Sequence, residues 1–194
     1  MMTSSTPVKI GGLFVAATAG MSLFALPAIA VDTSIDQVPI RAVSAIDWKA
    51  AGSAVDDLQN ADATVGAAFK ASSPAGFDDV TLPIMILGAE AAVDLPAFQG
   101  QGSAYSAYYK LEDAQLSVMG AKTRLVDVPG LSFVNESYAY ESIGDGADHM
   151  LSRFGAFYTL RITCDAPTKD ARCIKPDYLA ELATTLIIVK GDSK

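Results

Sequence analysis

Residues 152–163 read Ser-Arg-Phe-Gly-Ala-Phe-Tyr-Thr-Leu-Arg-Ile-Thr, and this stretch sets the class of fold. Side chains on a β-strand point alternately to its two faces. One face then carries Phe154, Ala156, Tyr158, Leu160 and Ile162, and the other carries Phe157, Thr159 and Arg161. We therefore predict a half-buried antiparallel strand over these residues.

Four further segments read as strands. Ser103–Leu111 and Ala114–Leu125 have the composition of a hairpin, and Leu131–Glu141 continues the pattern. Thr81–Leu87 is a short apolar run, which is typical of a buried strand. The sheet is thus expected to hold about five strands.

Two segments carry apolar residues at helical spacing. The first, Ala45–Ser72, predicts an amphipathic helix, either continuous or broken, because Gly52, Gly66 and the segment Asn60–Asp62 weaken its middle. The second begins at Pro176, which suits the first turn of a helix, and carries its stripe as far as Leu186. We predict an α+β fold, with an N-terminal and a C-terminal helix packed on one face of the antiparallel sheet. The alternative is a β-sandwich with helical additions.

The first thirty residues have the features of an export signal. Lys9 precedes the 21 uncharged residues Ile10–Ala30, and small residues stand at Ala28 and Ala30. We predict cleavage after Ala30, so that residues 31–194 form one globular domain in the periplasm or outside the cell. The alternative is an uncleaved anchor in the inner membrane, because 21 residues are long enough to span a bilayer.

The charge of the chain restricts its partners. The formal net charge is −8, and it becomes −9 without the leader, because Lys9 is the only charged side chain removed. An acidic surface repels nucleic acid and anionic lipid. The mature sequence has no further apolar run of membrane-spanning length. No cofactor motif is present either, so no cofactor is predicted.

Two cysteines, Cys164 and Cys173, lie nine positions apart across a polar loop. In an oxidising compartment this spacing predicts one structural disulfide. A regulatory thiol pair and a metal site are the alternatives. A redox-active pair usually stands closer together, and two cysteines with one histidine do not complete a four-ligand zinc site.

His149 is the only histidine, so any histidine-based triad would have to use it. Ser152 lies close in sequence, but no Gly-x-Ser-x-Gly elbow is present. His149 is therefore a weak catalytic candidate, and the other interpretation is a histidine in an exposed loop or hairpin corner.

Asp145 and Asp148 flank Gly146 in a run that resembles part of a calcium loop. The further ligands of an EF-hand loop are missing. These two carboxylates are weak metal candidates, and a polar turn between strands is the simpler interpretation.

Tyrosines in the predicted strands are the one feature that favours a ligand groove. Each offers flat apolar area with a polar tip. The candidates for such a groove, on the open face of the sheet, are Tyr105, Tyr109, Tyr140 and Tyr158. Tyrosine is also favoured in strands for packing alone, so a core role is the alternative.

These patterns favour an exported, non-catalytic protein that binds an unknown ligand or an envelope protein. A serine-type hydrolase using His149 is a second hypothesis. A third is a homodimer, formed through a strand edge or through the apolar stripe from Trp48 to Phe69.

Overall fold

The computed structural model describes residues 40–43, 45–91, 94–126 and 139–193. The predicted leader and its cleavage point lie outside these residues, as does most of the predicted strand Leu131–Glu141. Within the described part of the chain, no helix is both long enough and apolar enough to cross a membrane.

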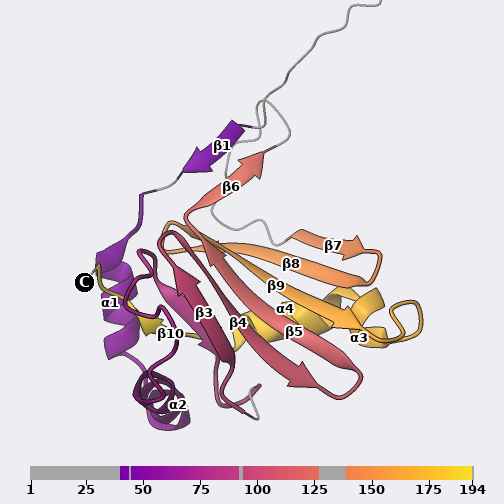
Figure 1. Cartoon of the computed structure of the whole chain (residues 1–194), viewed down its shortest axis with the longest axis horizontal. Helices are drawn as coiled ribbons and strands as arrows, with labels where there is room; N and C mark the ends of the chain where they lie inside the picture. The colour runs from indigo at the N-terminus through magenta and orange to yellow at the C-terminus, as the bar shows by residue number, and fades with distance from the viewer. Residues whose placement is uncertain (1–39, 44, 92–93, 127–138, 194) are drawn as a thin grey trace, which may run out of the picture. The chain divides into compact units, whose positions relative to one another are not determined.

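A six-stranded antiparallel sheet is the largest element (Figure 1). Its strands, in spatial order, are β3 (Ala97–Gln101), β4 (Ala104–Leu111), β5 (Ala114–Ala121), β9 (Ala156–Cys164), β8 (Gly146–Arg153) and β7 (Ala139–Ile143). The predicted antiparallel sheet is confirmed, but it has six strands rather than five. Along β9 the alternation holds: Tyr158, Leu160 and Ile162 are buried, whereas Arg161 is exposed.

The start of the predicted strand 152–163 is wrong, because a two-residue turn separates β8 from β9. Phe154 and Gly155 form it, with φ angles of 51° and 74°. Two consecutive positive φ angles match the twist of a tight hairpin. Phe154 therefore does not share a strand face with Tyr158.

Two small sheets hold the other strands of the described residues. β2 (Ile84–Leu87) pairs with β10 (Leu186–Lys190), and all the residues of both strands are buried. β1 (Ile40–Val43) pairs with β6 (Thr123–Val126). The prediction of a C-terminal helix through Leu186 is wrong at its end, because the chain finishes on β10 instead.

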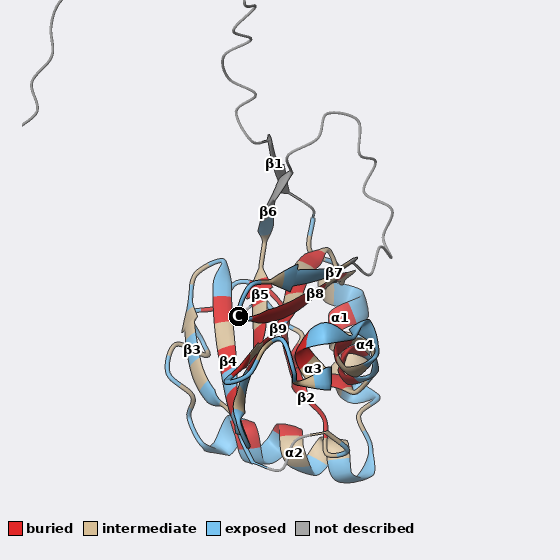
Figure 2. Cartoon of the chain, turned by 90° about the vertical axis from the view of Figure 1, so that its right-hand side faces the viewer, coloured by how far each residue is buried: buried red, intermediate tan, exposed pale blue. Residues whose placement is uncertain are grey.

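Four helices flank the sheets: α1 (Trp48–Asp56), α2 (Asn60–Ala71), α3 (Ala171–Ile174) and α4 (Pro176–Thr184). α3 and α4 pack on β8 and β9, as predicted for the C-terminal helix. α1 and α2 pack mainly on β10 rather than on the large sheet as predicted, although Phe69 of α2 contacts Phe98 of β3 edge-to-face, with ring centroids 5.4 Å apart. The inner face of the large sheet is the one turned toward β2, α3 and α4. Figure 2 shows in red how burial concentrates there.

Candidate functional site

Three of the four candidate tyrosines place their hydroxyls on the backbone of β2 or of Pro83, the residue before it. Tyr105 accepts from Met85 N–H at 2.8 Å and donates to Met85 C=O at 2.8 Å. Tyr109 accepts from Leu87 N–H at 2.9 Å, and Tyr158 donates to Pro83 C=O at 3.0 Å. All three tyrosines are buried.

The pairing of β2 explains this arrangement. The backbone groups of a strand point alternately to its two sides. β10 lies along one side of β2, and the polar groups of positions 83, 85 and 87 point to the other, where no strand pairs among the described residues. The tyrosine hydroxyls supply the partners that buried backbone groups require. We name Tyr105, Tyr109 and Tyr158 the tyrosine row.

The expected groove shared by four tyrosines on the open face is therefore wrong. Tyr105 and Tyr158 belong to the core, and burial is the main cause that raises the pKa of each phenol. Tyr140 is half-buried, and its hydroxyl donates to Cys173 C=O at 3.0 Å. Tyr109 lines a hollow, which is a different one from the groove predicted.

His149 is buried in β8 rather than exposed in a loop. It is opposite Tyr140 on β7 and Leu160 on β9, so its side chain lies on the inner face. Burial lowers the pKa of its imidazole. Ser152 is three residues further along β8 and therefore points to the outer face. The fold thus does not bring His149 and Ser152 together as a nucleophile and its base.

Asp148 is also part of β8, on the outer face, and its carboxylate is held by Arg161 of β9. Arg161 Nε and Nη2 donate to the two oxygens at 2.7 and 2.6 Å. Asp145 is exposed in the preceding turn. Among the described residues, no group of three or more acidic, histidine or cysteine side chains is placed to hold a metal ion. The calcium interpretation therefore receives no support from these two residues.

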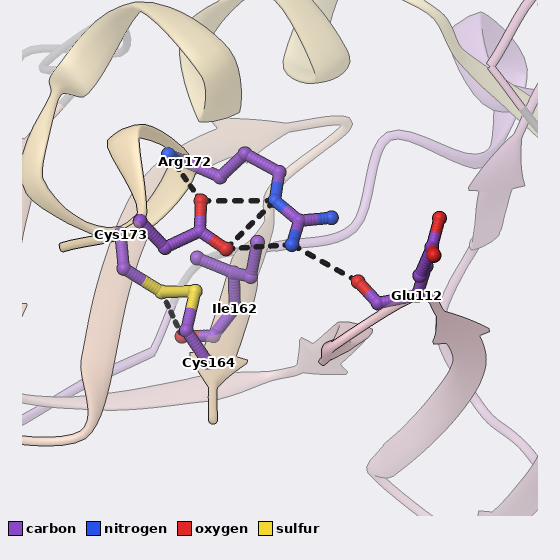
Figure 3. Close-up of polar contacts among 6 residues, drawn as sticks. Glu112, Ile162, Cys164, Arg172 and Cys173 are labelled. Carbon is purple, nitrogen blue, oxygen red and sulfur yellow. Dashed lines mark hydrogen bonds and ion pairs between the residues drawn. A yellow bond between two sulfur atoms is a disulfide. The ribbon is translucent and has the colours of Figure 1, made fainter. Parts of the chain in front are cut away.

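Cys164 and Cys173 form the predicted disulfide, with Cα atoms 6.4 Å apart. Figure 3 shows its surroundings. Arg172 is held by the Asp170 carboxylate at 2.6 Å and donates to Glu112 C=O at 3.0 Å. The bridge and this arginine tie α3 to the end of β9 and to the β4–β5 turn.

A hollow of about 330 Å³ lies beside the start of β3. We name it the edge hollow. It is lined by Leu87, Ala91, Asp94, Leu95, Ala97, Tyr108, Tyr109, Lys110 and Leu111.

Large apolar side chains are exposed around the edge hollow. Leu95 is 43% exposed and Tyr108 is 39% exposed, and both line it. The third large apolar side chain exposed in the described part of the chain is Ile174 on α3, at 49%. Exposed apolar side chains that gather at a hollow are typical of binding surfaces, whereas single ones are common.

Polar groups are also available at the edge hollow. The Tyr109 hydroxyl accepts one hydrogen bond but donates none to the described residues, unlike the hydroxyl of Tyr105. Gly100 N–H points away from β4, to Ala75 C=O, so by alternation the backbone of Lys110 points to the β3 side. Among the described residues β3 pairs with β4 only as far as Tyr108, which leaves Lys110 N–H and C=O without a strand partner there.

Only weak signals for this site are present in the sequence. Tyr109 was a groove candidate because of its residue type, whereas Leu95 stands in a Pro- and Gly-containing stretch without strand periodicity. Leu95 meets Tyr109 only because β3 pairs with β4, which is a long-range feature.

The comparisons with known proteins identify no relative. No protein-family model, no curated protein and no solved structure matches this chain.

Proposed function

We propose that this chain is an exported, non-catalytic binding protein whose edge hollow takes a small amphipathic molecule. In this proposal the leader is cleaved after Ala30, and residues 31–194 act as a single domain in the periplasm or outside the cell. The disulfide supports an oxidising location, because such bonds persist there.

One observation carries the proposal. The hydroxyl of Tyr109 donates no hydrogen bond to the described residues, and it lies in a hollow with apolar walls. A buried hydroxyl that accepts one bond still has a proton to give. Leu95 and Tyr108 supply the apolar walls. Ligand sites commonly combine such walls with a few polar groups, in hollows of roughly 300–1,000 Å³.

The same features define the ligand class. The rim carries one cationic and one acidic side chain, Lys110 and Asp94, so net charge does not select the head group. Tyr109 selects a hydrogen-bond acceptor. The ligand is therefore an alkyl or aryl group that bears a hydroxyl, carbonyl or carboxylate oxygen.

Thermal unfolding with 1-octanol and octanoate as probes tests this site. Binding only to the folded state raises the melting temperature. We expect both probes to raise it at millimolar concentration. Leu95→Ser should abolish the rise. The matched control Ile174→Ser, which also removes an exposed apolar side chain, should keep it. No rise in the wild type, or equal rises in the two variants, would contradict the proposal.

Intact-mass spectrometry of protein from its native host tests export. We expect the mass of residues 31–194, two hydrogen atoms lighter than the reduced chain. A species that retains its leader would favour the membrane-anchored alternative. A serine labelled by a fluorophosphonate probe, with labelling lost in His149→Ala, would overturn the non-catalytic assignment.

Light scattering of the mature protein tests the homodimer hypothesis. Ala51 and Phe69 of the Trp48–Phe69 stripe are buried within their own chain, so the stripe already has an intramolecular role. We expect the mass of a monomer.

A further inference from the structure

Besides the edge hollow, two further hollows lie on either side of the β8–β9 turn. Each has a volume of about 350 Å³, and the two share Arg153 and Phe154. We name them together the turn groove. One hollow is bounded by α1, α2 and β10, and the other by residues at the start of α1.

The backbone fixes Arg153 and Phe154 in place. Phe154 takes a positive φ angle of 51°, which is unusual for a bulky residue. Its C=O accepts from Asp47 N–H at 2.9 Å. Gly155 permits this contact, because a Cβ there would meet Ala45 O at 2.0 Å. The hairpin therefore cannot shift away from α1 without losing the hydrogen bond to Asp47 and the close approach of Gly155 to Ala45.

The guanidinium of Arg153 has N–H donors in the turn groove that bond to none of the described residues. One Nη2 hydrogen bond goes to Ala183 C=O at 3.2 Å, at the end of α4. This bond stabilises the helix terminus. A guanidinium has five N–H donors, and the described residues accept from no other.

Two carboxylates line the same hollow as Arg153. Asp62 Oδ1 accepts from Ala89 N–H at 2.9 Å, and the second oxygen has no partner among the described residues. Glu90 is exposed at the rim and forms no ion pair within the described ranges. Neither acid neutralises Arg153 directly, since no described salt bridge joins them.

Part of the floor of this hollow is apolar, although polar atoms make up more of its lining. Leu186, Ile187 and Ile188 of β10 form the apolar part together with Met85, and all four are buried. The hollow therefore combines an apolar surface with separate cationic and anionic side chains.

We propose that the turn groove binds a small apolar zwitterion, an apolar α-amino acid or a short peptide of such residues. Its carboxylate binds Arg153, its ammonium group binds the carboxylates of Asp62 and Glu90, and its side chain covers the β10 floor. Either charge alone would meet a like charge in the hollow, so the pair of charges is favoured. The volume, near the lower end for ligand sites, suits a small molecule. This site is independent of the edge hollow.

Isothermal titration calorimetry with leucine and leucyl-leucine tests the proposal. We expect saturable binding of at least one of them and no binding of N-acetyl-leucine amide, which lacks both charges. Arg153→Gln should weaken binding about tenfold or more, because it removes a charge-assisted hydrogen bond. Arg153→Lys should weaken it less.

The controls separate binding from folding. Glu90→Gln changes an exposed side chain and should weaken binding without lowering the melting temperature. Lys49→Gln removes an exposed charge of α1 outside the groove and should leave binding unchanged. Leu95→Ser should also leave it unchanged, which distinguishes this site from the edge hollow. Equal binding of the capped amide, unchanged binding in Glu90→Gln, or no binding of either zwitterion would overturn the proposal.

Discussion

Replacing tyrosines of the row by phenylalanine should destabilise the protein in a definite order. Tyr105→Phe removes the partners of both Met85 N–H and Met85 C=O, and Met85 is only 1% exposed. A buried N–H left unpaired costs about 1–3 kcal/mol, and a buried C=O costs about 1–2 kcal/mol because unpaired carbonyls are tolerated somewhat better. The free energy of unfolding should therefore fall by about 2–5 kcal/mol, a large part of the roughly 5–15 kcal/mol typical of a domain.

The other members of the row make fewer bonds. Tyr109→Phe orphans one N–H and should cost about 1–3 kcal/mol. Tyr158→Phe orphans one C=O and should cost about 1–2 kcal/mol, because unpaired carbonyls are tolerated somewhat better than unpaired N–H groups. Tyr108→Phe is the matched control, since Tyr108 is 39% exposed and forms no hydrogen bond with the described residues. It should lie within about 0.5 kcal/mol of the wild type.

Urea unfolding followed by far-UV circular dichroism measures these differences. The slope of unfolding free energy against urea should stay constant while the midpoint falls, because the exposed area does not change. Tyr105→Phe within 0.5 kcal/mol of Tyr108→Phe would refute the reasoning. A smaller loss for Tyr105→Phe than for Tyr158→Phe would refute it as well.

Four further outcomes can be measured. Burial raises the pKa of Tyr105, Tyr109 and Tyr158, so at least three of the seven tyrosines should stay protonated above pH 10 until the chain unfolds. The free energy of unfolding should therefore fall as pH rises above about 10, and phenolate absorbance will measure the titration. Burial lowers the pKa of His149, so the unfolded state binds its proton first, and stability should begin to fall as pH drops below about 6.5; urea midpoints should show a smaller fall between pH 7 and pH 5 in His149→Gln. Arg161→Gln leaves the side chain of Asp148, which is 9% exposed, without its cation and should cost about 1–3 kcal/mol in urea unfolding. Asp148→Asn leaves Arg161, which is 44% exposed, free to contact water and should cost less than about 1 kcal/mol. Reducing the disulfide, or the double variant Cys164→Ser with Cys173→Ser, should cost about 2.5–3 kcal/mol on the chain-entropy model, and an unchanged midpoint would show that the bridge does not restrain the unfolded chain.

Local periodicity predicted much of the large sheet. β4, β5 and β9 follow the alternation of their residues, because in each strand one face lies in the core. The turn at Phe154 was missed because a phenylalanine seldom takes a positive φ angle. Its energy there depends on contacts with Asp47 and on the glycine that follows. Those contacts join residues more than a hundred positions apart.

Buried polar residues explain the largest error of interpretation. Asp145–His149 looks like a polar turn, yet most of it lies in β8 as a strand with little exposure. Asp148 tolerates burial because Arg161 faces it across the strand pair. A carboxylate and an arginine 13 positions apart give no signal of this pairing in a single sequence. The charge of Asp148 in the sequence therefore does not predict its exposure, because a cross-strand partner is available.

The tyrosines show where residue type stops being informative. Tyr105 and Tyr109 lie on the same face of β4, and the hydroxyl of each bonds to the backbone of β2. They differ in how many of their hydrogen bonds the fold uses. The hydroxyl of Tyr105 uses its donor and one acceptor site in hydrogen bonds to Met85, so it has no proton to donate to a ligand. Tyr109 keeps its donor and lines a hollow that exposed apolar side chains surround. The distinction between a tyrosine with a structural role and one proposed to bind a ligand thus comes from a count of satisfied groups, which requires the position of β2 and therefore the tertiary structure.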